Sequence, residues 1–176
     1  VIGLGYIGLP TAALLACKGY SVSGVDINYR VVDTINSGGV HIVEPDLEQY
    51  VDQAVSSGAL EAFLQPQMAD IYIICVPTPF YADKELPTPN LEYVVSATES
   101  IAPLVKPGDI VILESTSPVG TTDRIKDILS AKAVNVEEIS IAYCPERVLP
   151  GKIMAELISN DRIIGGINEE ATRKVA

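Results

Sequence analysis

A glycine-rich segment, GLGYIG at residues 3–8, constrains the fold of this chain more than any other feature. It ends a short apolar run at residues 1–4 and opens an alanine-rich segment of helical period. In such a strand–turn–helix, the first glycine permits a tight turn and the second lets the backbone approach a pyrophosphate. The third glycine allows close packing of helix on strand, and N–H groups at the helix start face the anion. The residues predicted to form this phosphate-binding loop are Gly3, Gly5, Tyr6, Ile7 and Gly8.

An acidic residue follows the next apolar run. Asp26 comes after residues 21–25, about 20 residues beyond the first glycine, where a carboxylate can accept both hydroxyls of an adenosine ribose. A carboxylate there repels the 2′-phosphate of NADP, so the predicted cofactor is NAD. Arg30 is predicted to flank the ribose or the adenine, and a solvated helix residue is an equally good interpretation of it.

Short β-branched apolar runs alternate with segments of helical period along the whole chain, which is typical of a parallel sheet with crossover helices. The predicted fold class is therefore α/β, a Rossmann-type doubly wound parallel sheet in a single domain, with residues 1–66 and 67–165 as its halves. A proline-rich loop at 77–90 is longer than packing requires, which indicates a functional loop. The predicted strands are 1–4, 21–25, 60–64, 71–76, 110–115, 139–143 and 162–165. The predicted helices are 8–18, 29–37, 47–57, 91–105 and 121–132, with Asn168 capping a further helix.

Composition excludes several classes of function. Asp and Glu number 23 against 12 Lys and Arg, and a net charge of −11 argues against nucleic-acid binding. No apolar run approaches the roughly 20 residues needed to cross a bilayer, so no membrane association is expected. Cys17, Cys75 and Cys144 are widely spaced and His41 is the one histidine, so neither a disulfide framework nor a metal site is predicted. A reducing, cytoplasmic location is expected.

Polar residues gather after three of the predicted strands, where ligands of a doubly wound sheet bind. Residues 76–79 (VPTP) form a rigid turn that can hold Thr78 at the cofactor. Residues 114–122 (ESTSPVGTT) place several hydroxyls at a helix start, and residues 144–147 (CPER) add a charged pair. Each segment also has a purely structural interpretation, which stays open. These are a plain proline turn at 76–79, helix capping at 114–122 and a structural ion pair at 144–147.

Together these motifs resemble the NAD-binding domain of the UDP-glucose/GDP-mannose dehydrogenase family. The resemblance runs through the whole chain, and residues 41–47 (HIVEPDL) and 142–151 (AYCPERVLPG) are most similar to the UDP-N-acetylmannosamine dehydrogenases within it. The segments that carry it, in the family's order, are 3–10 (GLGYIGLP), 25–28 (VDIN), 76–79 (VPTP), 114–120 (ESTSPVG) and 145–147 (PER).

This resemblance implies an enzyme of nucleotide-sugar metabolism and polysaccharide biosynthesis that oxidises the C6 hydroxyl of UDP-N-acetylmannosamine to a carboxylate. The reaction uses two NAD and passes through an aldehyde and a cysteine thioester. Thr116 and Glu146 match positions that orient or activate the hydrolytic water, a role that suits a carboxylate beside a hydroxyl. The other matched positions are Thr78 and Thr122 at the cofactor, and Arg147 and Val148 at the nucleotide-sugar.

The family's catalytic cysteine, a lysine and an asparagine lie after the NAD domain, and no cysteine of this chain matches the nucleophile. Residues 1–176 are therefore expected to be the NAD-binding domain of a larger enzyme, without its central helix and C-terminal substrate domain, and to be inactive alone. The full-length enzyme is expected to be a homodimer.

Three alternatives stay open. The first is a UDP-glucose 6-dehydrogenase or another UDP-sugar member of the family. The second is a β-hydroxyacid or 6-phosphogluconate-type dehydrogenase, which shares the glycine loop and Asp26 but does not explain residues 145–147. The third is a non-catalytic NAD-sensing module, which has no need of the hydroxyl-rich segment at 114–122.

Overall fold

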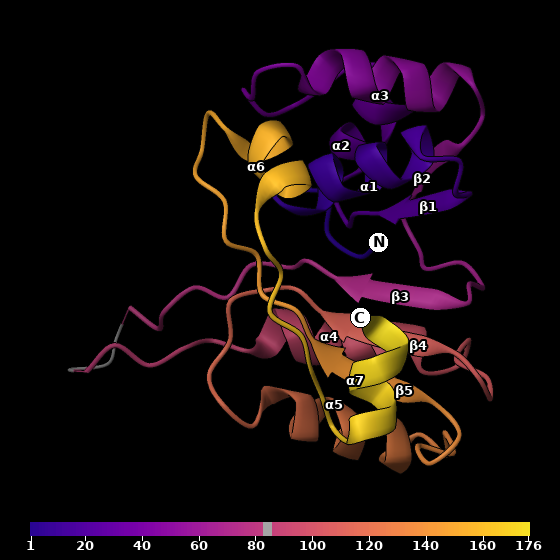
Figure 1. The fold of residues 1–176 in the computed structure, drawn as a ribbon, viewed down its shortest axis with the longest axis vertical. Helices are drawn as coiled ribbons and strands as arrows, with labels where there is room; N and C mark the ends of the chain where they lie inside the picture. The colour runs from indigo at the N-terminus through magenta and orange to yellow at the C-terminus, as the bar shows by residue number, and fades with distance from the viewer. Residues whose placement is uncertain (83–85) are drawn as a thin grey trace. The chain divides into compact units, whose positions relative to one another are not determined.

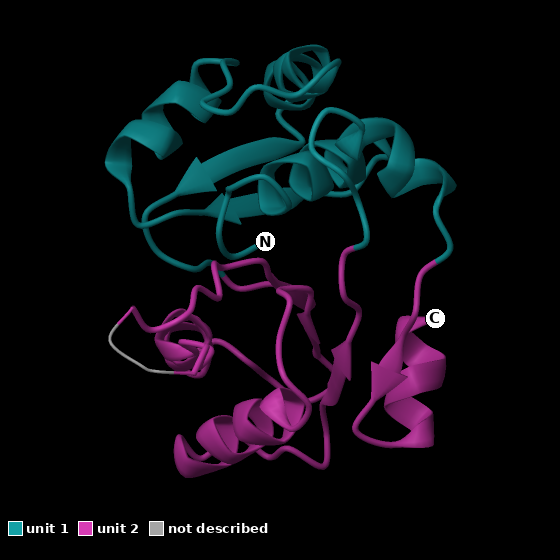
Figure 2. Cartoon of the chain, turned by 90° about the vertical axis from the view of Figure 1, so that its left-hand side faces the viewer, with its two compact units in different colours: residues 1–67, 147–161 teal, residues 68–146, 162–176 magenta. Residues whose placement is uncertain are grey.

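The computed structural model describes residues 1–82 and 86–176, which form two compact units (Figure 1, Figure 2). The proline-rich loop at 77–90 therefore falls partly outside the described residues. The division of the chain into halves at residue 66 is close to the first crossing between the units, which follows Gln67. Residues 147–161, however, were assigned to the second half and belong to unit 1. Unit 1 consists of 1–67 and 147–161, and unit 2 of 68–146 and 162–176.

Unit 1 is built on a small parallel sheet. Its strands β1 (Val22–Val25) and β2 (Leu60–Phe63) pair in parallel. The segment predicted as a strand at 1–4 runs alongside β1 through an isolated parallel bridge between Ile2 and Val25. The helices of the unit are α1 (Gly8–Cys17), α2 (Tyr29–Asn36), α3 (Leu47–Ser56) and α6 (Ile153–Ser159).

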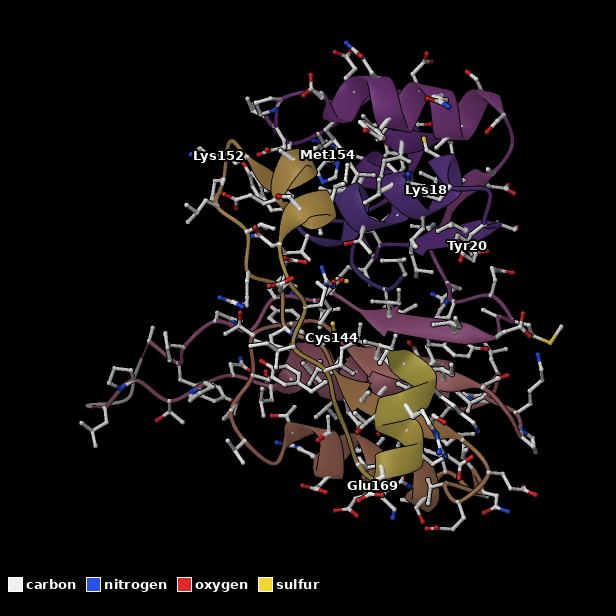
Figure 3. All side chains as sticks on the ribbon, in the orientation of Figure 1. Lys18, Tyr20, Cys144, Lys152, Met154 and Glu169 are labelled. Carbon is white, nitrogen blue, oxygen red and sulfur yellow. The ribbon has the colours of Figure 1, made fainter. Side chains whose placement is uncertain are left out.

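Small side chains on α1 form the centre of the unit 1 core. Ala12, Ala13 and Ala16 are buried, and α1 packs against α3, β1 and α6. Alanines let the neighbouring elements approach closely, because the distance between packed helices depends on the side chains at the contact. Met154 of α6, labelled in Figure 3, joins the same cluster of buried residues. Helix α6 is not among the helices predicted from the sequence, because its core contacts come from residues far away in the chain.

Glu44 fastens α6 to the rest of unit 1. Its buried carboxylate accepts hydrogen bonds from the backbone N–H of Gly151 and that of Ile153, both at 2.7 Å. Ile153 is the first residue of α6, so its N–H has no partner within the helix. Glu44 therefore caps α6 from more than a hundred residues away in the sequence.

Replacing Glu44 by alanine is expected to lower the free energy of unfolding by about 3 kcal/mol, because two backbone N–H groups lose a charged acceptor. Urea unfolding of the chain, followed by circular dichroism, measures the loss. Glu61→Ala, which removes an exposed carboxylate from β2, is the matched control and should change stability by less than about 0.5 kcal/mol. Equal effects of the two substitutions would contradict the capping role.

Unit 2 is built on a sheet with the strand order β3-β4-β5-β6. The first three strands are parallel, and β6 is antiparallel to β5. The strands are β3 (Ile71–Ile74), β4 (Ile110–Leu113), β5 (Ser140–Tyr143) and β6 (Gly165–Gly166). The helices are α4 (Glu92–Ile101), α5 (Thr121–Ala131) and α7 (Glu169–Val175).

The last predicted strand, at 162–165, differs from the observed one in position, length and direction. Only Gly165 and Gly166 pair with β5, and they do so in the antiparallel sense. A Cβ on Gly166 would lie 2.3 Å from the backbone nitrogen of Thr172 in α7, so this position requires glycine. Asn168 caps α7 as predicted, accepting the N–H of Ala171 at 2.8 Å. Across the described residues, no helix has the length and apolar character of a membrane span.

Candidate functional site

The glycine loop has the conformation that its sequence predicts. Gly3 has a φ of 91°, a left-handed conformation that glycine adopts without strain. Gly5 has no such φ, and a Cβ on it would meet no protein atom within 4 Å. Neither backbone strain nor internal packing therefore requires glycine at position 5. The open space at this position leaves room for an external group to approach the backbone.

The start of α1 offers backbone donors beside this loop. Ile7 occupies the N-cap position, and no side chain caps the helix. Among the described residues, no hydrogen bond uses the backbone N–H of Tyr6 or Ile7. Uncapped N–H groups at a helix start attract an anion, which fits the pyrophosphate of a dinucleotide. Gly8, the first residue of α1, is buried.

Asp26 is held at the same end of unit 1 as the glycine loop. Its Oδ2 accepts the backbone N–H of Leu4 at 3.1 Å, and its Oδ1 accepts that of Asn28 at 2.9 Å. The side chain is half-buried directly after β1. These two bonds orient the carboxylate, and each oxygen retains capacity to accept from a ribose hydroxyl. Arg30 lies exposed in the first turn of α2.

His41, for which the sequence predicts no role, also lies near Asp26. Burial lowers the pKa of His41, while the charge of Asp26 and a hydrogen bond to the backbone of Leu4 act in the opposite direction. The neutral imidazole is thus favoured beside the proposed ribose carboxylate. The sequence signal was its place in the loop at 38–46, but only the fold brings that loop to Asp26.

In unit 2, hydroxyl groups connect the segments that follow β3 and β4. Thr78 donates to the backbone carbonyl of Thr116 at 2.6 Å, and Ser115 donates to that of Val76 at 2.7 Å. Thr116 itself is exposed, and Thr122 is half-buried in the first turn of α5. No side chain caps α5, whose N-cap is Gly120, so helix capping does not explain these hydroxyls.

The carboxyl ends of β3, β4 and β5 carry a group of charged and thiol side chains that we call the Arg162 cluster. Arg162 forms ion pairs with Glu114 and with Glu146, and Cys144 is near enough to raise its pKa. Cys75 donates its thiol proton to Oε2 of Glu114 at 3.0 Å. The cluster consists of Cys75, Glu114, Cys144, Glu146 and Arg162, all within unit 2. Glu146 is thus brought to charged partners that the sequence analysis did not assign to the site.

Burial controls the protonation of this cluster. It raises the pKa of Glu114, and the thiol of Cys75 and the charge of Arg162 act to lower that pKa. The pKa of the Cys75 thiol is well above its ordinary value, first through burial and then through the neighbouring charge of Glu114. Burial acts to lower the pKa of Arg162, but the neighbouring Cys144 and the charge of Glu114 outweigh this effect, and the pKa is raised. Arg162 is therefore a permanent cation.

Arg147 and Val148 lie in unit 1, on the segment that leads into α6. The amide of Asn160 donates to the backbone carbonyl of Arg147 at 2.9 Å, and the side chain of Arg147 is exposed. Glu156 accepts the backbone N–H of Leu149 at 2.8 Å. The two residues predicted to contact the nucleotide-sugar thus lie on a short segment that is held by side chains of the α6 region.

A hollow of about 420 Å³ in unit 2 lies away from these residues. It is lined by residues that include Ser140 at the start of β5 and Asn168 at the start of α7. Ligands of parallel α/β sheets bind at the carboxyl ends of the strands, and this hollow is at the amino end of β5. Among the residues that the structure describes, no group of His, Cys, Asp and Glu could hold a metal ion.

Comparison with known proteins gives a consistent result. Residues 1–176 match the family model described as the UDP-glucose/GDP-mannose dehydrogenase family, NAD binding domain. The chain is 51% identical to the UDP-N-acetyl-D-mannosamine dehydrogenase of Yersinia pestis, with 100% of this chain and 43% of that protein aligned. It is also 51% identical to the NDP-N-acetyl-D-galactosaminuronic acid dehydrogenase of Ralstonia nicotianae, over 98% of this chain and 42% of that protein. The chain thus spans less than half the length of these relatives.

Solved structures support the same fold. The UDP-N-acetyl-mannosamine dehydrogenase of Staphylococcus aureus aligns with a TM-score of 0.91 and 40% identity, over 99% of this chain and 42% of that one. The prediction of a Rossmann-type α/β fold is therefore confirmed. The individual site residues named from the sequence remain predictions, because no comparison assigns a role to any of them.

Proposed function

The chain belongs to the UDP-glucose/GDP-mannose dehydrogenase family as its NAD-binding domain, and on this premise we propose that the complete enzyme oxidises the C6 hydroxyl of UDP-N-acetylmannosamine to a carboxylate. Two NAD are consumed for each sugar, because this is a four-electron oxidation. The observation that supports the cofactor site best is the bond from the N–H of Leu4 to Asp26, which ties the ribose carboxylate to the residue beside Gly3.

Different residues of the chain are proposed to bind different parts of NAD. When bound, NAD supplies the acceptor for the hydride that leaves C6. In unit 1 the N–H groups of Tyr6 and Ile7 bind the pyrophosphate, Asp26 accepts the ribose hydroxyls and Arg30 flanks them. The open space at Gly5 fits this assignment. The cofactor contacts proposed in unit 2 are Thr78 and Thr122.

Asp26→Asn is expected to narrow the preference for NAD over NADP. The wild-type chain should bind NAD about 10- to 100-fold more tightly than NADP, since the carboxylate accepts hydroxyls and repels a phosphate. Asparagine keeps an acceptor for the N–H of Leu4 and removes the charge. The substitution should therefore weaken the binding of NAD and strengthen the binding of NADP. Calorimetric titration of the chain with both nucleotides measures the ratio. Asp33→Asn, an exposed acid on α2, is the matched control.

Equal affinities of the wild-type chain for the two nucleotides would contradict the assignment of Asp26. The same conclusion would follow if Asp26→Asn and Asp33→Asn gave identical ratios of NADP to NAD affinity.

The remaining roles are proposed for residues of each unit: Glu146 and Thr116 belong to unit 2, and Arg147 and Val148 belong to unit 1. Glu146 and Thr116 orient and polarise the water that hydrolyses the thioester, and Arg147 and Val148 contact the nucleotide-sugar. Glu146 follows β5 and its side chain is 6% exposed, so it can act on an ordered water more effectively than a solvated carboxylate can. Steady-state assays of the complete enzyme with UDP-N-acetylmannosamine test the substrate.

The comparisons support a second candidate substrate, a nucleotide sugar of N-acetylgalactosamine. The relative from Ralstonia nicotianae is as similar to this chain as the one from Yersinia pestis, and its name refers to N-acetyl-D-galactosaminuronic acid. A parallel assay with the corresponding N-acetylgalactosamine nucleotide therefore belongs in the same experiment. The sugar with the higher kcat/KM is the substrate.

Location and assembly are proposals for the complete enzyme. We propose a cytoplasmic protein, a location in which the free Cys17, Cys75 and Cys144 would remain reduced. We also propose a homodimer, on the basis of the family resemblance. Light scattering coupled to gel filtration measures the mass of the assembly.

A further inference from the structure

Arg162 connects the two ends of the segment that runs through unit 1. Glu146 is the last residue of unit 2 before the chain enters unit 1, and Arg162 is the first residue after the chain returns. The Nη1 of Arg162 donates to Oε2 of Glu146, and its Nη2 donates to Oε1 of Glu114. One guanidinium therefore bridges a buried carboxylate after β4 to the carboxylate proposed to activate water.

Burial makes this bridge strong and specific. The side chains of Glu114 and Glu146 are 2% and 6% exposed, and that of Arg162 is 31% exposed. Two neighbouring carboxylates that are shielded from water stay ionised together only when a cation lies between them. The planar guanidinium has donors for two acceptors at once, in contrast to the single point charge of a lysine.

The other contacts of the cluster fix the guanidinium in place. The thiol of Cys75 occupies Oε2 of Glu114, so Oε1 is directed to Arg162. The backbone N–H of Glu146 donates to the carbonyl of Glu114 at 3.4 Å, which joins the ends of β4 and β5. A continuous chain of bonds thus runs from Cys75 through Glu114 and Arg162 to Glu146.

We propose that Arg162 is a positioning residue for thioester hydrolysis: it fixes the orientation of the Glu146 carboxylate, and Glu114 in turn fixes Arg162. This inference rests on the proposed function of Glu146. Arg162 need not touch the sugar, the cofactor or the water. The first hydride transfer does not use the Glu146 carboxylate, so loss of Arg162 should affect hydrolysis selectively.

The test compares Arg162→Met and Arg162→Lys in the complete enzyme by stopped-flow measurement of NADH and by intact-protein mass spectrometry. Methionine keeps the volume and removes the charge. We expect the first NADH to form at close to the wild-type rate and hydrolysis to slow roughly 10- to 100-fold, with sugar accumulating on the enzyme. Lysine keeps the charge but replaces the planar two-pronged guanidinium by a single ammonium, so its hydrolysis rate should lie between those of wild type and methionine. Arg173→Met, on the exposed side of α7, is the matched control and should hydrolyse at the wild-type rate.

A second measurement on the 176-residue chain does not depend on activity. Glutamate labelled with ¹³C at the side-chain carboxyl allows the titration of Glu114 to be followed by NMR, with Glu114→Gln used to assign its signal. Arg162 acts to lower the pKa of Glu114. The midpoint of the Glu114 titration should therefore move to higher pH in Arg162→Met. If the methionine variant does not fold, the same titration is made on Arg162→Lys. Lysine keeps the cation but stabilises the ionised form of Glu114 less, so the Glu114 midpoint should again lie at a higher pH than in the wild type.

The outcomes separate this inference from the proposed function. Hydrolysis at the wild-type rate in Arg162→Met, in an enzyme whose wild type turns over, would overturn the positioning role and leave the proposed function standing. An unchanged Glu114 midpoint would overturn it as well. Absence of NADH from the wild-type enzyme with every UDP-sugar tested would overturn the proposed function, while a shifted Glu114 midpoint would still show that Arg162 controls the charge of the cluster.

Discussion

Replacing Glu146 by glutamine in the complete enzyme is expected to give a burst of NADH followed by a stall. Hydride transfer from C6 needs alignment of the sugar with the nicotinamide, which glutamine does not disturb. Hydrolysis needs a base to polarise water, and an amide is not a base. General-base catalysis contributes about 10²- to 10⁴-fold, so the hydrolysis rate should fall by that factor. The sugar should stay covalently attached to the catalytic cysteine.

Rapid-mixing measurement of NADH and intact-protein mass spectrometry check this expectation. Glu137→Gln, an exposed carboxylate in unit 2, is the matched control and should neither stall nor accumulate an adduct. Turnover of Glu146→Gln at the wild-type rate with no adduct would show that Glu146 is only a structural partner of Arg162.

The 176-residue chain is expected to bind NAD and to give no steady-state NADH with UDP-sugars. The thiolate is the reactive form of cysteine, and burial raises the pKa of both Cys17 and Cys75. Cys144 is buried, so its sulfur is shielded from a substrate. None of the three is therefore presented to a substrate as an exposed, activated nucleophile.

The expected lack of turnover is tested by following NADH absorbance with UDP-N-acetylmannosamine and with UDP-glucose. Calorimetry on the same preparation shows that NAD is bound, which distinguishes missing chemistry from a misfolded chain. Sustained turnover that Cys144→Ser abolishes would contradict the expectation and identify Cys144 as the nucleophile.

Local sequence patterns predicted most of the fold because most elements carry their own signals. The helix at 8–18 and the strand at 60–64 were identified from periodicity and from the stop signals that follow them, close to the observed α1 and β2. In contrast, α6 has seven residues and no side-chain cap of its own. Its start is stabilised by Glu44, 109 positions from Ile153, and no local pattern contains that information.

The same distinction applies to the candidate site. The ends of the predicted strands correctly placed Asp26 after β1 and Glu146 after β5. The pairing of Glu146 with Arg147 is an inference from adjacency, and it stays a prediction; the structure shows an ion pair of Glu146 with Arg162. The bonded partner, Arg162, lies 16 positions from Glu146 and 48 from Glu114. Such a cluster arises from the meeting of three strand ends, which one sequence does not specify by spacing.

Residues 147–161 also determine when unit 1 can finish folding. During synthesis, β1, β2 and three helices of unit 1 emerge first, but the buried surface that receives Met154 stays uncovered until α6 leaves the ribosome. The sheet of unit 2 is likewise incomplete until Gly166 and α7, which come later in the chain, have been synthesised. Contacts between residues far apart in the chain form slowly, because the intervening loop must close first. Neither unit can complete its core as an early, independent product of translation, and exposed apolar surface on the nascent chain is a natural substrate for chaperones.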